Sequence, residues 1–305
     1  MSSYLLTRTL QMIVVVFGVV TVTFFAVRLV PGDPARLMEP PGTSESSLKI
    51  TRERLGTDKP LLVQYVNFLK RLPHGDLGTT FRGSEPVTNR VLDGLPNTFA
   101  LGLVSMVLTT VLSFAIGIVA ALKPGGVFDR ISLLFVAIAQ STPSFWLGVI
   151  FVLIFSIKLR WFPAIDMTSW KSFVLPSATL TISLMPLLIR AVRQSIIETM
   201  GEGFIRAARA RGLSERQIIG RHVMKPSAIP LITLVGLQAG YVLGGAVVIE
   251  SIFNWPGIGN MALLAIQQRD FPMVQGTVLA IAIVFTLINF LVDLTYSVLD
   301  PRVKY

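Results

Sequence analysis

The stretch that decides the fold is "TFALGLVSMVLTTVLSFAIGIVAAL", residues Thr98 to Leu122. It contains no charged residue, and it is long enough to cross a bilayer, because a membrane helix needs about 20 mainly apolar residues. Five other segments are also mainly apolar: Leu10–Val30, Ile131–Ile157, Phe173–Ile189, Ile229–Phe253 and Val274–Leu299. The sequence therefore predicts an all-α membrane protein with about six transmembrane helices. We expect Pro143 to bend the third. Pro176 and Pro186 predict that the fourth is short and interrupted.

The composition supports this class and excludes others. Of 305 residues, 52% are hydrophobic and only 14% are charged, whereas soluble domains carry about 25% charged residues. The net charge of +10 lies in the links between apolar segments, which indicates membrane topology rather than a nucleic-acid-binding face. With no cysteine, with His74 and His222 predicted on opposite sides of the membrane, and with no catalytic motif, we expect neither a metal site nor an enzyme.

The positions of Lys and Arg in the short links predict the orientation. The basic links fall on one side if both termini are cytoplasmic, which is the side that carries more positive charge. The link 31–97 is longer than about 60 residues, so its own charge does not decide its side, and we expect it outside. Within it, apolar residues at helical spacing between Pro60 and Pro73 predict an amphipathic helix. The predicted organisation is a membrane helix at 1–30, an extracytoplasmic insert at 31–97, and a core at 98–300 with a cytoplasmic loop at 198–228.

The most charged stretch is that loop, "EGFIRAARARGLSERQIIGRHVMKPSAIP", from Glu202 to Pro230. Helix-forming residues precede Gly212, which is suited to a positive-φ helix end. Ser214 and Gln217 then match a capping box that starts a second helix. Apolar residues among the arginines would let this hairpin dock into a groove of a partner: Phe204, Ile205, Ala207, Ala208 and Leu213. The alternative is a basic loop that only fixes topology or touches anionic lipid.

Polar residues within the apolar segments mark a second candidate site, because they are costly in a bilayer. They either line a pathway or join helices by packing: Gln140, Gln238, Glu250, Asn289 and Asp293. The stretch "NWPGIG" carries Trp255, which is suited to the membrane interface, and Pro256, Gly257 and Gly259, which break a helix. We expect a bend there, followed by a short helix from Ile258 to Gln267 across an outer mouth. The alternative is an ordinary polar turn.

Several blocks of the sequence resemble one known family. "FIRAARARGLSERQIIGRH" is similar to the EAA coupling loop of ABC-transporter permeases: Ala207, Ala208 and Gly212 match its spacing, while Arg206 replaces its glutamate. Further blocks resemble the B-type permease of dipeptide and oligopeptide importers. They are "PGDPAR" at 31–36, "LGTDKPLLVQY" at 55–65, "HGDLG" at 74–78, "ESIFNWPGIG" at 250–259, "RDFPMVQG" at 269–276 and "NFLVDLTYSVLDPRVKY" at the end.

The resemblance implies a type I ABC importer permease in the inner membrane that forms half of a translocation pathway. It implies as partners a second homologous permease, two ATPase domains or subunits and an extracytoplasmic solute-binding protein, beside membrane lipid and without nucleic acid. The residues implied to engage the ATPase are Arg206, Ala207, Ala208, Gly212, Ser214 and Gln217. This chain has no GxxxxGK[ST] phosphate loop, so it should hold no cofactor, and ATP and Mg should bind to the partner subunits.

The substrate class follows from the same resemblance. Di- or oligopeptides are the first expectation, and glutathione or chelated nickel are the alternatives within the family. A remoter alternative is a self-contained, ion-driven transporter with its site at broken helices.

Overall fold

The computed structural model describes residues 2–29, 32–40, 42–81, 85–164 and 169–299. Over these residues the regular secondary structure is helical. Thr79 and Pro86 also form an isolated antiparallel β-bridge. The chain divides into two compact units, one from 1–99 with 255–287 and one from 100–254 with 288–305.

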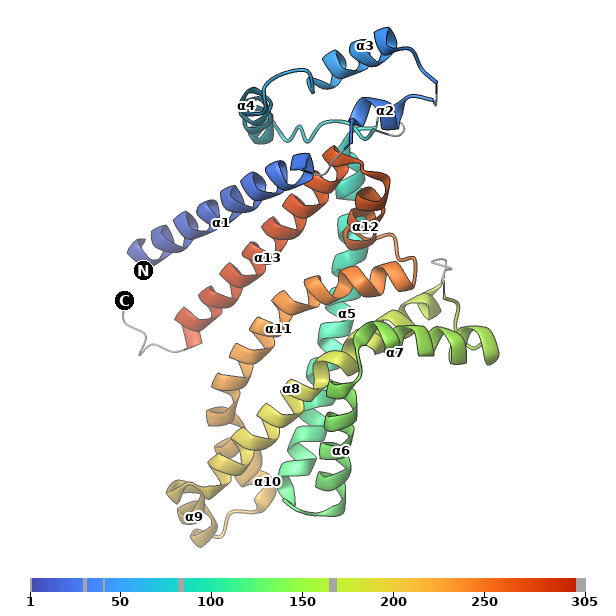
Figure 1. Cartoon of the computed structure of the whole chain (residues 1–305). Helices are drawn as coiled ribbons and strands as arrows, with labels where there is room; N and C mark the ends of the chain where they lie inside the picture. Colours follow the sequence, from blue (N-terminus) through green and yellow to red (C-terminus); the bar gives the residue numbers. More distant parts are fainter. Residues whose placement is uncertain (1, 30–31, 41, 82–84, 165–168, 300–305) are drawn as a thin grey trace. The chain divides into compact units, whose positions relative to one another are not determined.

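The first unit combines membrane helices with the helices of the predicted insert (Figure 1). Its long helices are α1 (Ser2–Leu29), the beginning of α5 (Val87–Leu122) and most of α13 (Phe271–Leu299), with the shorter α12 (Ile258–Gln268) before α13. The insert contains α2 (Pro34–Met38), α3 (Glu45–Leu55), α4 (Leu61–Arg71) and the single turn η1 (Leu72–His74). Because α5 begins at Val87, the end of the 31–97 link is the start of a helix.

The amphipathic helix predicted between Pro60 and Pro73 is α4, and it packs on α1. Phe68 is buried in a cluster with Val20 and Phe24 of α1 and Leu279 of α13. The rings of Phe24 and Phe68 stack with centroids 5.5 Å apart. Burial of such aromatic pairs stabilises helix contacts, so α4 is fixed along the end of the first span.

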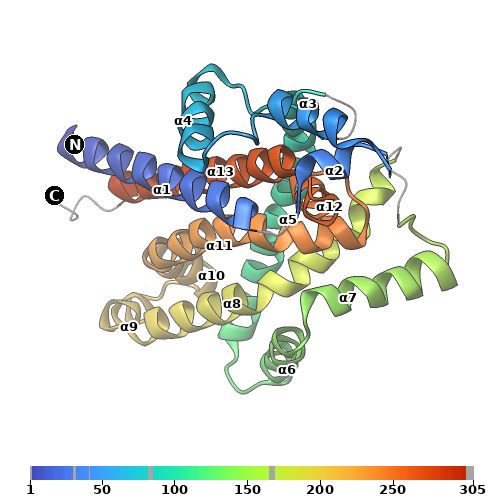
Figure 2. The same ribbon diagram turned by 45° about the horizontal axis from the view of Figure 1, so that its top comes forward.

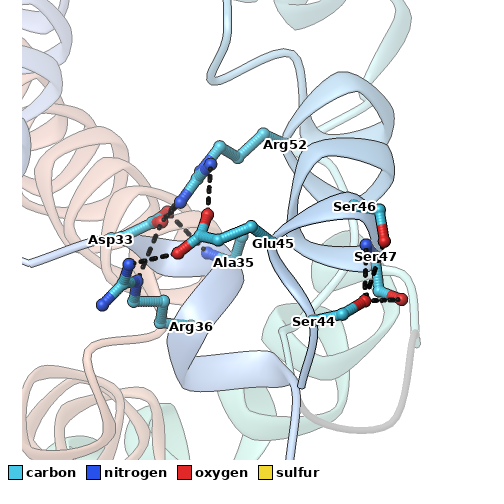
Figure 3. Close-up of polar contacts among 8 residues, drawn as sticks. All are labelled: Asp33, Ala35, Arg36, Ser44, Glu45, Ser46, Ser47 and Arg52. Carbon is cyan, nitrogen blue, oxygen red and sulfur yellow. Dashed lines mark hydrogen bonds and ion pairs between the residues drawn. The ribbon is translucent and has the colours of Figure 1, made fainter. Parts of the chain in front are cut away.

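An ion-pair network joins α2 to α3 (Figure 3). Arg52 of α3 donates from Nε and Nη2 to Oδ2 of Asp33, at 2.8 and 2.6 Å. Asp33 also caps α2, since its Oδ1 accepts a hydrogen bond from the backbone N–H of Ala35. Glu45 accepts from both Arg36 and Arg52. The described part of the "PGDPAR" block, from Gly32 to Arg36, is therefore a capped helix start held by a charge network.

The second unit is a bundle around α8 (Figure 2). It contains the rest of α5, α6 (Val127–Ser141), α7 (Ser144–Phe151) with the π-helical η2 (Val152–Lys158), the turn η3 (Trp170–Phe173), α8 (Val174–Gly201), α9 (Gly203–Ala210), α10 (Glu215–Gln217), the π-helical η4 (Ile218–Val223) and α11 (Met224–Ile252). Helix α8 contacts α6, α7 and α11. The second unit therefore has one central helix.

A buried ion pair joins α6 to α8. Arg193 of α8 donates from Nε and Nη2 to the carboxylate of Asp129, with the latter contact at 2.8 Å. The Asp129 side chain is 2% exposed and that of Arg193 is 20% exposed. Asp129 also accepts from the backbone N–H of Gly125 at 2.7 Å. Its charge is thus satisfied by three donors inside the protein.

The structure confirms the apolar spans, including the bend expected at Pro143 in the third, and corrects the fourth. Among the described residues, five helices are long and apolar enough to cross a membrane, or up to six if one bent pair counts as a span. That pair is the predicted third span, which is broken by 99° between Ser141 and Ser144. The break lies at Thr142–Pro143, because a proline disfavours helical backbone in the residue before it.

The expectation that the fourth span is short and interrupted is wrong. Helix α8 runs for 28 residues from Val174 to Gly201, with Pro186 inside it. Pro176 lies in the first turn, where its missing N–H has no helical partner to lose. The helix continues past Ile189 although the apolar run ends there.

Candidate functional site

The predicted loop folds as a helix–turn–helix hairpin. Helix α9 ends at Ala210, and Gly212 adopts φ +80°. Ser214 begins α10 with a capping box, in which its backbone N–H donates to Gln217 Oε1 at 3.1 Å. Helix α10 continues through π-helical η4 into α11. The turn at Gly212 and the cap at Ser214 are as the sequence predicts, and Figure 1 shows α9 and α10 beside the end of α8.

One face of this hairpin is buried against its own chain. Ile205 and Ala208 of α9 and Ile218 of η4 lie in a core cluster with Val192 and Ile196 of α8. Ile205 and Ile218 have no exposed surface. The expectation that Ile205, Ala208 and the half-buried Leu213 are offered to a partner is wrong, because residues three apart on a helix share one face, and here that face packs on α8.

The opposite face is exposed and mainly basic. Phe204 is 47% exposed, and Arg206, Ala207 and Arg211 are exposed beside it. Arg209 forms an ion pair with Glu215 across the turn, with Nε–Oε1 at 2.7 Å. The hydrogen bond from Arg209 lowers the pKa of the Glu215 carboxyl group, which keeps the pair charged at neutral pH. An aromatic ring among guanidinium groups suits an apolar groove with an acidic rim.

The structure separates the predicted pathway residues into buried and exposed ones. Gln238 of α11 is 4% exposed, and its Nε2 donates to the carbonyl oxygen of Leu184 in α8 at 2.9 Å. Glu250 is fully buried. Gln140 is exposed on α6, and Asn289 is half-buried, while the side chain of Asp293 lies outside the described residues. The three predicted pathway residues therefore do not share one exposed surface that could line a pathway: Gln140, Gln238 and Glu250. The hydrogen bond of Gln238 is instead a contact that joins two helices.

We expect the variant Gln238→Leu to keep uptake within about twofold of the native protein. The loss of the hydrogen bond to Leu184 should slightly lower the midpoint of thermal unfolding, because an interhelical hydrogen bond in a membrane contributes roughly 0.6 kcal/mol. Gln140→Leu is the matched control on an exposed face. Uptake by each variant complex, with unfolding followed in detergent, checks this. A complete loss of uptake in a normally assembled Gln238→Leu complex would contradict the packing role.

The 255–259 motif bends into α12 as predicted, and three hydrogen bonds attach it to α5. Asn97 Nδ2 donates to the carbonyl oxygen of Pro256 at 2.9 Å. Trp255 Nε1 donates to the carbonyl oxygen of Asn97 at 3.0 Å. The backbone N–H of Ile258 donates to Thr98 Oγ1 at 2.9 Å. These contacts start α12 at a defined place beside α5.

Trp255, expected to suit the membrane interface, is 2% exposed and packs within the protein interior rather than on its surface. Gly257, with φ −97°, precedes α12, and Gly259 is buried within it. Sequence reasoning missed Asn97 and Thr98 as partners of this motif. The available signal was a polar pair just before the apolar run of α5.

Comparison with known proteins assigns the family. Residues 113–305 match the family described as "Binding-protein-dependent transport system inner membrane component", and residues 1–102 match its N-terminal companion. The chain is 36% identical over 305 residues to the glutathione transport system permease protein GsiC of Pectobacterium atrosepticum, covering 100% of both chains. It is 34% identical, with the same coverage, to GsiC of Escherichia coli strain K12.

Solved structures show the same fold. An inward-facing structure of the MetNI methionine ABC transporter matches with a TM-score of 0.58 at 20% identity, over 69% of this chain and 96% of that one. An amino acid ABC transporter solved with histidines matches with a TM-score of 0.55 at 16% identity, over 69% and 94%. The chain therefore belongs to the inner membrane components of binding-protein-dependent transport systems and is a permease of an ABC importer.

Proposed function

We propose that this permease forms half of an ATP-driven import pathway for short peptides and is coupled to ATP hydrolysis through the hairpin 202–222. In this proposal a second homologous permease completes the pathway. Two ATPase domains bind ATP and Mg and contact the hairpin, and an extracytoplasmic solute-binding protein delivers the substrate. Both termini and the hairpin are cytoplasmic, and the insert is extracytoplasmic.

The observation that supports coupling most strongly is the shared core of hairpin and membrane helices. Ile205 and Ile218 of the hairpin are buried with Val192 of α8 and Leu231 of α11. Because packed interiors transmit displacement, an ATPase that moves the exposed face of α9 also moves α8 and α11. A nucleotide that stabilises one arrangement of the ATPases then favours one arrangement of the membrane helices.

The relatives guide the substrate proposal. The full-length relatives named here are glutathione permeases, and glutathione is itself a tripeptide. We therefore place glutathione with dipeptides and longer peptides as the substrates to test first, and a nickel chelate after them. An ion-driven transporter would need no ATPase. That alternative therefore gives the exposed basic face of the hairpin no role.

Uptake in cells tests the whole proposal. A strain that lacks this chain is supplied with the native gene, and accumulation of labelled dipeptide, oligopeptide, glutathione and nickel chelate is measured. Copurification identifies the neighbouring subunits. We expect restored accumulation of one peptide class that stops when ATP is depleted, together with copurified ATPases. Uptake into liposomes that contain this chain alone, driven by an ion gradient, would overturn the proposal.

The orientation is tested by cysteine labelling, because the native chain has no cysteine and gives no background. Ser46 of α3 and Ser214 of the hairpin are both exposed. We expect an impermeant thiol reagent to label Ser46→Cys on intact cells and Ser214→Cys only after the cells are opened. Equal labelling of the two variants on intact cells would contradict the orientation.

A further inference from the structure

A cationic cavity lies where the insert meets the ends of the membrane helices of the first unit. Its volume is about 260 Å³, and it lies among α1, α3, α4 and the start of α13. Three arginines line it, Arg28, Arg54 and Arg71, and none of its lining residues in the described chain is acidic. Three guanidinium groups around one space repel one another, so an anion in that space is favoured.

The cavity wall also holds a polar group that is not satisfied. Gln275 of α13 lines the cavity and is 7% exposed. Its Nε2 is buried and has no hydrogen-bond partner within the part of the chain that the structure describes. A buried donor without a partner costs about 1–3 kcal/mol. If the side chain turned its Nε2 towards the cavity, a ligand with acceptor oxygens would remove that cost.

Arg28 is held in place within this cavity. Its Nε donates to Gln64 Oε1 at 3.0 Å, and its guanidinium group lies 3.5 Å from the centroid of the Phe24 ring. Arg28 belongs to the last turn of α1, a helix apolar enough to span the membrane. The cavity is therefore at the depth where lipid headgroups meet a span.

An apolar groove adjoins the cavity. Its volume is about 360 Å³, and it runs along α1, α5 and α13. Its walls include Val16, Val20, Leu92, Leu279, Ile283 and Val284. Leu77 lines both spaces, and Gly276 of the groove follows Gln275 of the cavity in the chain. A charged cavity thus lies next to an apolar groove beside membrane-spanning segments.

We propose that the cavity and the groove together bind one anionic phospholipid, with its phosphate among the arginines and an acyl chain in the groove. Basic pockets between membrane helices bind anionic headgroups, and a chain in the groove adds apolar burial. A free phosphate would use the cavity alone, so the groove distinguishes the two sources of the anion. This inference does not depend on the transported substrate.

Native mass spectrometry of the purified complex tests the site. The complex is exchanged into phosphatidylcholine nanodiscs with or without phosphatidylglycerol, and retained lipid is counted. The variant Arg54→Gln with Arg71→Gln removes two exposed cations of the cavity. The control Lys49→Gln with Lys59→Gln makes the same charge change at exposed insert positions outside the cavity lining.

We expect the arginine variant to lose about tenfold or more of its phosphatidylglycerol retention, and the lysine control to keep it. Ala280→Phe, which fills the groove, should lower retention with all arginines present, and inorganic phosphate should not displace the lipid. Equal retention in the arginine variant and the lysine control would overturn the proposal. Displacement of the lipid by phosphate alone would overturn the proposal in favour of a free anion. Unchanged lipid retention with reduced affinity for the solute-binding protein would overturn it in favour of that protein as the occupant.

Discussion

Replacing Gly212 by valine should reduce ATP-driven uptake by about tenfold while the permease still inserts and assembles. Gly212 adopts φ +80°, and an added Cβ would meet no atom of the described residues within 4 Å, so the effect comes from the backbone alone. A left-handed conformation costs a residue with a Cβ about 1–2 kcal/mol, and a β-branched residue is strained most. The turn therefore relaxes, and the exposed face of α9 shifts relative to α10.

The measurements are subunit stoichiometry, ATPase rate and uptake of purified complex in lipid. Gly203→Val is the matched control, since Gly203 starts α9 with open space around it and without positive φ. Gly212→Asn is a second control, because asparagine tolerates left-handed backbone. We expect both to keep most of the coupled activity. If Gly212→Val transports normally, the hairpin only fixes topology, as the alternative interpretation of the basic loop states.

The second large effect should come from the buried pair of Asp129 and Arg193. Removing one partner leaves a buried charge unpaired, which costs about 3–5 kcal/mol. Asp129→Ala should therefore sharply lower the thermal stability of the complex and the amount that assembles. The loss should exceed that of Gln238→Leu several-fold, because a neutral interhelical hydrogen bond contributes far less.

A double variant distinguishes charge from packing at this site. Asp129→Leu with Arg193→Met replaces both charges by apolar side chains, and such replacements of buried pairs are often neutral. We expect this variant to recover most of the stability that Asp129→Ala loses, as measured by the fraction of intact complex after heating. A double variant as unstable as the single one would show that the contribution is not the cancellation of charge.

The membrane class and the hairpin could be predicted from sequence because both depend on local signals. About 20 apolar residues define a span whatever lies around them. Gly212, Ser214 and Gln217 specify a turn and a cap through neighbouring backbone groups alone. The same local logic places the start of α12 at Ile258, within the 255–259 motif.

What the sequence could not predict depends on distant partners. Helix α5 begins at Val87, in a stretch whose charged residues and Pro96 interrupt the apolar pattern. Trp255 can be buried since its Nε1–H donates a hydrogen bond to the carbonyl oxygen of Asn97, which is far away in the chain. Ile205 and Ala208 look available beside arginines until α8 covers them. A periodic apolar face indicates burial, but it does not identify the surface that covers it.

The length of α8 has a mechanical consequence. At 1.5 Å per residue, 28 residues make a rod of roughly 42 Å, and the hairpin follows its end at Gly201. If that end moved sideways by about 4 Å with the other held, the rod would tilt by roughly 5°. If α8 stays rigid, every helix packed along it is tilted with it. If α8 bends at Pro186, where the hydrogen-bond ladder lacks a donor, only the half of α8 next to the hairpin tilts. The stiffness of α8 at Pro186 thus determines the length of the helix over which a displacement of the hairpin is transmitted.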